Sequence, residues 1–453
     1  MLTTLAAPAF AGTWCIDEGN ITVKAGDTKG KNTVSQGNKK DVEDTNTIIT
    51  GTSNENTVTI DTSKGNVDVT FDDLNIDASS RNEAAVSVTG SGNTTIKLDG
   101  DNHLTGGISD NGSYGLSGIS SSGSLTISGG KTDSLTAQGG SGTDGSGGRG
   151  ITNNRGVTIS SGGTVTAKGG SGEDGSGGRG ISSFGGVTIS SGGTVTATGG
   201  NSTGSDGSGG DGISSTSTTI SGGTVTADGG SGNFSGGNGI RSFDVAISGG
   251  TVNVAGGNGG NGSGSDVGNG IISSDIDLSG SLELTAKAGS PNGKALSRAG
   301  HELNLNDIKD KLGPGAKVTA TDADGKVIDQ VSTPRPVEPE ESSSSSDGGS
   351  AAPSAPVSPL PGLTVTDKDG QRISYTSTQS GNTLTVCVGR FTASFRISLA
   401  ALRQLRAEGI ETIAFQTILC STTLSVDELL AMGSEDAEAV LTHRFTDSSL
   451  TVG

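Results

Sequence analysis

The sequence predicts an all-β fold: a parallel, right-handed β-helix (solenoid) of Gly-rich coils about 30 residues long, followed by a small C-terminal α+β domain. Three observations lead to this fold class. The composition is too poor in apolar residues for one large core, a repeat runs through the middle of the chain, and each repeat carries three strand signals.

The composition is far from that of an ordinary globular domain. Of 453 residues, 80 are glycine, only 29% are hydrophobic and 3% are aromatic. Globular chains are nearly half apolar, and a chain this rich in Gly and Ser is usually disordered unless it has a period. The presence of a period therefore decides the fold class.

The repeat is visible in two sequence signals that keep the same spacing. GGTVTA occurs at 162–167, 192–197 and 222–227, and a Gly-Ile pair recurs at 118, 150, 180, 212, 239 and 270. Between them lies VTIS, at 157–160 and 187–190. Each unit thus holds three short strands whose Val, Ile and Ala face inward while Thr and Ser face outward. One unit buries too little apolar surface to offset its ordering entropy, so the units must stack.

The segment before the repeats also alternates like a series of half-buried strands, with Val67, Val69 and Phe71 in one run and Leu74 and Ile76 in the next. The run LDGDNHLTGG at 98–107 and the opening GTWCIDEGNITVKAG at 12–26 resemble the carbohydrate-binding-domain β-helix proteins of Gram-positive bacteria. The resemblance covers roughly 12–300. It implies a secreted or cell-surface protein that binds polysaccharide, with a fold shared by pectate lyases.

The two ends of the solenoid are marked by changes in composition. Residues 1–11 read as the remnant of a signal peptide, because Ala9-Phe10-Ala11 fits a cleavage site; we therefore expect a secreted or cell-surface protein. The β-helix is predicted over 12–332. A linker rich in Pro, Ser and Glu over 333–362 cannot pack and is predicted to be disordered.

The last segment, 363–453, alternates as strands at 384–388, 391–397 and 410–417, and is predicted to be a small α+β domain. Ser398 caps a helix that Gly409 ends, and Ser425 begins a second helix as a capping box. An exported chain permits a disulfide, and Cys387 and Cys420 are the pair expected to be near neighbours.

One position in each repeat carries the candidate carbohydrate-binding residues. The residue before Gly-Ile runs Arg149, Arg179, Asp211 and Asn238, and equivalent positions stack in a solenoid. Two interpretations stay open. The column is a site for a small anion or a uronate, or it is a solvated column in which Asp144 and Asp174 pair the arginines.

Asp144 and Asp174 are also the candidate calcium ligands, because GGSGTDG and GGSGEDG match the start of a calcium-binding nonapeptide. That motif needs consecutive repeats, whereas here it occurs once per coil, so a flexible turn is the competing interpretation. The three His and three Cys are scattered and predict no zinc site, and no other cofactor is expected.

The net charge of −19 argues against nucleic-acid partners, and no apolar stretch is long enough for membrane insertion. Three functions remain: a non-catalytic polysaccharide-binding surface protein, a structural adhesin or stalk without a small ligand, and a polysaccharide (uronate) lyase. No catalytic residue is assigned. The lyase alternative would draw on charged residues of the early coils, namely Asp72, Asp73, Arg81, Lys97, Asp99 and Asp101.

Overall fold

The computed structural model describes residues 12–27, 30–110, 112–190, 192–260, 268–334, 362–367, 370–373, 375–380, 382–388, 392–417, 421–433, 437–443 and 448–452. The predicted signal remnant at 1–11 and nearly all of the predicted linker at 333–362 lie outside these residues. The chain divides into two compact units, Met1–Glu340 and Glu341–Gly453. Each unit is described by itself.

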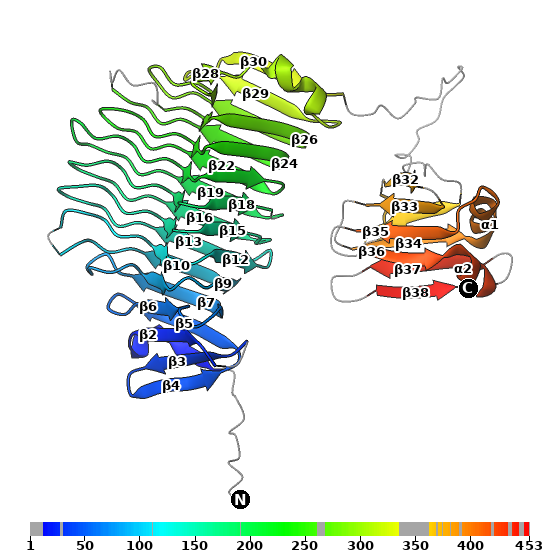
Figure 1. Ribbon diagram of the computed structural model, residues 1–453, viewed down its shortest axis with the longest axis horizontal. Coiled ribbons are helices and arrows are strands. Elements are labelled where there is room, and N and C mark those ends of the chain that lie inside the picture. Colours follow the sequence, from blue (N-terminus) through cyan, green and yellow to red (C-terminus); the bar gives the residue numbers. More distant parts are fainter. Residues whose placement is uncertain are drawn as a thin grey trace, which may run out of the picture. The chain divides into compact units, whose positions relative to one another are not determined.

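The first unit is a parallel β-solenoid, which confirms the predicted fold class (Figure 1). Its first ladder contains the Gly-Ile strands, and all of these rungs pair in parallel. The rungs are β2 (Ile21–Ala25), β6 (Val58–Asp61), β8 (Val86–Thr89), β11 (Ile119–Ser121), β14 (Ile151–Asn153), β17 (Ile181–Ser183), β20 (Ile213–Ser214), β23 (Ile240–Arg241), β25 (Ile271–Ser273) and β27 (Leu296–Arg298).

The VTIS signal forms the second ladder and the TVTA signal forms the third, as predicted. The second ladder contains β9 (Thr94–Asp99), β12 (Leu125–Gly129), β15 (Gly156–Ile159), β18 (Gly186–Ile189) and β21 (Ser217–Ile220). The third contains β10 (Asp101–Thr105), β13 (Ser134–Gln138), β16 (Thr164–Lys168), β19 (Thr194–Thr198), β22 (Thr224–Asp228) and β29 (Lys317–Thr321).

The second and third ladders are not separate sheets, which the sequence did not predict. Three long strands run through the corner between them and join both ladders into one sheet, together with β1 (Thr13–Cys15) and β5 (Thr47–Ser53). The long strands are β7 (Val67–Asp77), β24 (Asp244–Ala255) and β26 (Asp275–Lys287).

The core is a continuous column of the inward side chains that the alternation predicted. In the coil of β15 and β16, Val157, Ile159, Val165 and Ala167 are all buried. Each coil lays its apolar residues over those of the coil below, in register. The apolar residues therefore form one core along the stack, although no single coil could hold one.

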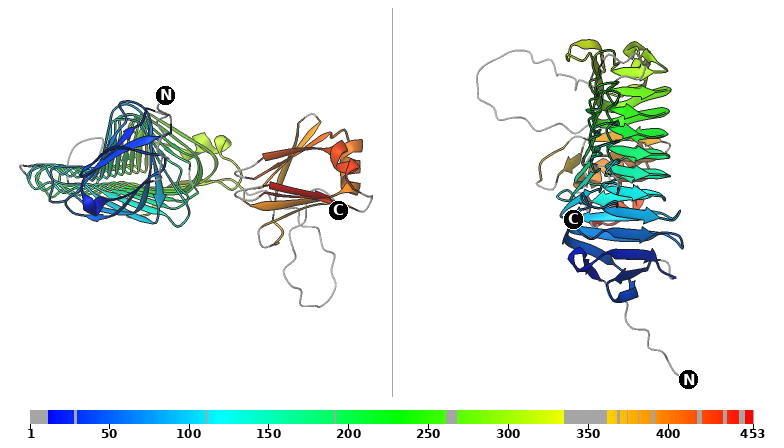
Figure 2. Two further views of the ribbon diagram at one scale, coloured as in Figure 1. Left: turned by 90° about the horizontal axis from the view of Figure 1, so that it is seen from below. Right: turned by 90° about the vertical axis from the view of Figure 1, so that its left-hand side faces the viewer.

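Between the third ladder and the next Gly-Ile strand, the chain leaves the body and returns. The loops at 139–148, 169–178, 199–210 and 229–237 stack into a thin layer, here called the glycine flap (Figure 2). The flap is hydrogen-bonded both within and between coils. The Gly148 N–H donates to Gly140 O (2.7 Å), the Gly170 N–H to Gly148 O (2.8 Å) and the Gly178 N–H to Gly170 O (2.8 Å). A Cβ at Gly178 would overlap Gly148 O, so the backbones approach this closely only because they are glycine.

Antiparallel strands cover both ends of the solenoid, where parallel pairing would otherwise leave open edges. At the start, β3 (Asn32–Gln36) and β4 (Lys39–Asp44) follow the η1 turn (Ile16–Glu18), and the buried Trp14 Nε1 donates to Asp44 Oδ2 (2.8 Å). At the end lie β28 (His301–Glu302), η2 (Leu305–Lys311) and β30 (Val327–Ser332).

The second unit has two four-stranded sheets and two helices, as predicted for an α+β domain. The Ser398 hydroxyl accepts from the Ala401 N–H and the Ser425 hydroxyl from the Glu428 N–H, so both predicted caps are confirmed. One sheet contains β31 (Leu363–Thr366), β34 (Ala393–Ser398), β37 (Glu438–His443) and β38 (Ser448–Val452). The other sheet contains β32 (Thr376–Ser380), β33 (Thr383–Cys387), β35 (Thr412–Gln416) and β36 (Ser421–Ser425). The helices are α1 (Leu399–Ala407) and α2 (Val426–Ala431).

In the part of the chain that the structure describes, no helix has the length and apolar character to span a membrane. Cys420 lies outside the described residues, so its predicted bond with Cys387 stays a prediction. The Cys387 thiol lies 3.1 Å from the Gln416 side-chain oxygen.

Candidate functional site

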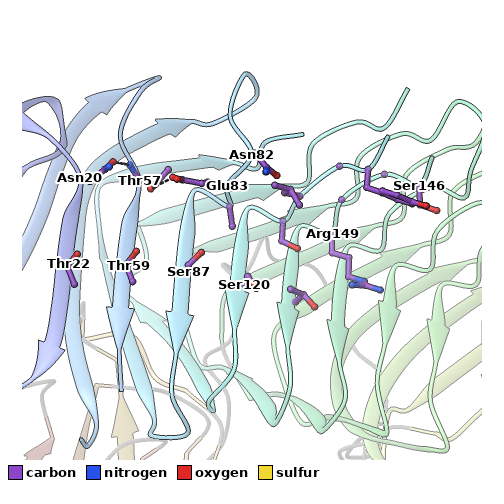
Figure 3. Close-up of a pocket in the computed structure, with 18 residues that line it drawn as sticks. Asn20, Thr22, Thr57, Thr59, Asn82, Glu83, Ser87, Ser120, Ser146 and Arg149 are labelled. Atoms are coloured by element: carbon purple, nitrogen blue, oxygen red, sulfur yellow. Dashed lines mark hydrogen bonds between the residues drawn. The ribbon is translucent and has the colours of Figure 1, made fainter. Parts of the chain in front are cut away.

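A row of hydroxyl side chains forms the floor of a groove on the solenoid. Thr22, Thr59, Ser87, Ser120 and Thr152 are register partners on five successive strands of the first ladder, β2 to β14. All five are half-buried and face outward, so their hydroxyls repeat about every 4.8 Å. Figure 3 shows four of them side by side, with Arg149 beyond Ser120. We call this row the hydroxyl ladder.

The wall of the groove comes from the glycine flap and from the loops before it. Residues 114–117 and 146–149 line one side, and Asn20, Asn82 and Glu83 contribute further polar groups. The groove has a volume of about 860 Å³. Tyr114, 57% exposed, is its aromatic side chain. We call this space the polar groove; it offers both donors and acceptors along its length.

The predicted column of Arg149, Arg179, Asp211 and Asn238 is brought together by the stacking, as the repeat implied. Gly118 and Gly150 donate to the carbonyls of Arg149 and Arg179, and Gly180 and Gly212 to those of Asp211 and Asn238, so the four residues occupy equivalent places. The first three line a second cavity of about 310 Å³, here called the arginine pocket. Arg149, Ser146 and Gly147 line both spaces, so the pocket continues the groove.

Asn238 does not line the pocket, although it was a candidate binding residue. Its side chain is fully buried, and its amide donates to Asp211 Oδ1 (2.8 Å) while its own carbonyl oxygen accepts from the Asn269 amide (3.0 Å). The asparagines thus form a buried column behind the pocket. Because Asn238 also donates its backbone N–H to Asp211 Oδ1 (3.0 Å), its role is to hold that carboxylate in place.

Asp211 is the central carboxylate of the arginine pocket and is almost completely buried. Its Oδ2 lies 3.3 Å from Arg179 Nε and 3.5 Å from Arg241 Nε, the latter without hydrogen-bond geometry. The expected pairing of the arginines by Asp144 and Asp174 is therefore wrong for Arg179. Among the residues described, neither of those aspartates forms an ion pair with an arginine.

Arg149 is the arginine of the pocket that has no carboxylate partner among the described residues. It is half-buried, and burial followed by the neighbouring charge of Arg179 lowers the pKa of its guanidinium. An arginine nonetheless stays protonated near neutral pH, because its ordinary pKa is above 12. Among the described residues that line the pocket, three are arginines and one is an aspartate, an excess of two positive charges in a chain whose net charge is −19.

Sequence reasoning missed the hydroxyl ladder and Arg241. Ser120, Thr152 and Arg241 directly follow a Gly-Ile pair, whereas Thr22, Thr59 and Ser87 lie on earlier strands that lack this pair. The ladder continues in register as Ser182 and Ser214, and Arg241 takes the next position. The signal was the outward residue of each Gly-Ile strand. It could have been found by aligning the residue after Ile as well as the residue before Gly.

The candidate calcium ligands Asp144 and Asp174 are exposed in successive loops of the glycine flap, joined by the bridge between Gly142 and Gly172. Within the described ranges, no three His, Cys, Asp or Glu side chains gather as a metal ion would need. Backbone bridges join successive loops, and the turn interpretation stays open beside the calcium one. Calcium binding stays a hypothesis.

The acidic residues considered for a lyase meet at a corner of the early coils. Asp72 pairs in register with Asp99, and the Asp101 N–H donates to Asp73 Oδ1 (2.8 Å). Burial, followed by the charges of Asp99 and Asp73, raises the pKa of Asp72. None of these carboxylates lines the polar groove.

No family model, no curated protein and no solved structure matches this chain.

Proposed function

We propose that the solenoid is a non-catalytic polysaccharide-binding module of a secreted or cell-surface protein, and that the polar groove is its binding site. The observation that carries this proposal is the hydroxyl ladder. A regular row of donors and acceptors matches a polymer that presents the same groups at a regular interval, whereas a compact ligand would use only part of the row.

The composition of the groove supports hydrogen bonding over stacking as the mode of binding. Tyr114 supplies one exposed ring in the groove, while hydroxyl, amide and carboxylate groups supply the remaining side-chain polarity. Sugars bound mainly through hydrogen bonds exchange contacts with water for contacts with protein, so each contact adds little net free energy. We therefore expect long chains to bind much better than short oligosaccharides, because many weak contacts add along the groove.

The test compares two tryptophan variants of one coil on a glycan array and by calorimetry with the full chain. Thr152 lies on the groove floor, and Thr158, also half-buried, faces outward on the next strand of the same coil. Thr152→Trp should block the groove and weaken binding about tenfold or more, and Thr158→Trp should leave it unchanged. Melting curves of both variants control for folding.

Three results would contradict the proposal, and each favours another outcome. If no glycan binds, the structural adhesin or stalk becomes the better account. If unsaturated uronides are released from an acidic polysaccharide, the protein is a lyase. If both tryptophan variants bind like the wild type, the ligand lies elsewhere on the chain.

A further inference from the structure

We infer that the arginine pocket is an anion subsite at the end of the polar groove, and that it selects polysaccharides bearing carboxylate or sulfate groups. This inference rests on the proposed function, because the pocket adjoins the groove through Arg149, Ser146 and Gly147. It adds the chemical class of the ligand and assigns different roles to the three arginines.

The roles differ because Asp211, the carboxylate among the described residues of the pocket, already has partners. Asp211 Oδ1 accepts from the backbone N–H and the side-chain amide of Asn238. Asp211 Oδ2 accepts from Arg179 Nε and also lies close to Arg241 Nε. Arg179 and Arg241 are thus positioned by a fixed, buried charge. Arg149 has no such partner among the described residues, so its planar fork of donors is free for a ligand.

The excess positive charge of the pocket favours binding of an anion, and it does so more strongly than the same charge would on an exposed surface. Arg149 is half-buried, and Arg179 stands close enough to perturb its titration. Bringing two like charges together at a partly desolvated site costs free energy. A carboxylate or sulfate that bridges Arg149 and Arg179 removes this cost and gains charge-assisted hydrogen bonds.

The shape of the pocket suits a substituent of a sugar ring. Its walls consist of the glycine backbone at 177–178, 209–210 and 236–237 together with Ser176, Ser208 and Ser235. Phe234, which is 49% exposed, is the aromatic side chain among the described residues of the wall. Small side chains let a polymer lie over the opening while one charged group enters. A polymer lying along the hydroxyl ladder would thus meet the arginines at the next coils.

The experiment measures binding of the full chain to two pairs of polymers: polygalacturonate and its methyl-esterified form, and dextran sulfate and dextran. We expect polygalacturonate or dextran sulfate to bind at least about ten times more tightly than the neutral polymer of its pair. The affinity for this anionic polymer should fall as salt is added. The first pair reports a carboxylate ligand, and the second a sulfate ligand.

Arg149→Gln should abolish the preference for the anionic polymer, so that the two members of the pair bind with similar affinity. The matched control is Arg155→Gln, an exposed arginine six residues further along the same coil that lines neither cavity. This control removes the same net charge. It therefore separates a local site from long-range attraction.

Two outcomes would overturn the inference while leaving the proposed function intact: neutral and anionic polymers bind equally, or Arg149→Gln and Arg155→Gln weaken binding to the same extent. If no polymer of either pair and no other glycan binds, the proposed function itself fails. An unfolded Arg149→Gln variant would be recognised by its melting curve, and Arg179→Gln would then replace it with the same expected loss of preference.

Discussion

At the scale of single residues, the glycine flap shows how strictly glycine can be required without a positive φ. A Cβ on Gly178 would overlap the carbonyl oxygen of Gly148 in the next layer, and one on Gly210 would overlap that of Gly178. On Gly156, in strand β15, a Cβ would meet its nearest atom, Gly186 O, only at 3.6 Å. The same residue type is thus indispensable in the flap and replaceable in a strand.

We predict that Gly178→Ala lowers the stability of the solenoid by roughly 1–3 kcal/mol, the usual cost of an overpacked site. Gly156→Ala should be neutral or stabilising by up to about 1 kcal/mol, because alanine loses less backbone entropy in a strand. Thermal melts of the two variants beside the wild type measure the difference. Equal melting temperatures would show that the flap backbones are not in contact.

His443 is a buried histidine of the C-terminal unit. Its ring is fully buried beside Phe395, and its Nε2 lies 2.9 Å from the Thr422 hydroxyl. Its Nδ1 has no hydrogen-bond partner among the residues that the structure describes. Burial lowers the pKa of His443 below its ordinary value. Above that ordinary value, about 6.5, both the folded and the unfolded states are neutral. As the pH falls below it, only the unfolded state takes up the proton, so stability is lost.

We therefore predict that the melting temperature of this unit falls between pH 7 and pH 5 in the wild type and falls less in His443→Gln. His301→Gln, at an exposed position of the solenoid, is the control and should keep the pH dependence of the wild type. Calorimetric scans at several pH values supply the measurement. A pH dependence that survives in His443→Gln would assign the acid sensitivity to other groups.

At the scale of elements, the sequence predicted the strands well because each one is decided by its own alternation. Val157 and Ile159 face inward and Thr158 faces outward, because side chains alternate along a strand irrespective of the strands beside it. The joining of the second and third ladders by β7, β24 and β26 could not be predicted. Whether a strand continues through a corner depends on the register of the neighbouring coil, as the irregularity between Ile247 and Gly249 shows.

The candidate site was predicted in part, for the same reason. Stacking follows from the repeat, so the column of Arg149, Arg179, Asp211 and Asn238 could be read from spacing. The depth of each side chain could not. Asn238 is buried behind the pocket and Asp211 is almost completely buried in its wall, whereas Arg149 and Arg179 are half-buried, and this difference depends on how the flap folds over them.

At the scale of the whole molecule, the coil is the unit of structure of the solenoid. In such stacks, stability is close to a sum of unit and neighbour terms, and every coil presents the same faces to the coils above and below. The chain as a whole is strongly acidic, and two excess positive charges are concentrated at one end of one groove. Repetition makes this concentration possible, because it places equivalent residues of successive coils side by side.

The most direct test of the central claim deletes one whole coil and, separately, half of one. Deleting 162–191 joins Ser161 to Gly192 and restores SGGTVTA, so Val195 and Ala197 still face inward over β13. Deleting 162–176 places a Gly-Ile strand where the third ladder should continue and leaves backbone groups unpaired on both sides. Circular dichroism melts should show a cooperative β-sheet transition close to that of the wild type for the first deletion, and its loss or a large fall in melting temperature for the second. Equal collapse of both proteins, or equal stability of both, would contradict a solenoid built from thirty-residue coils.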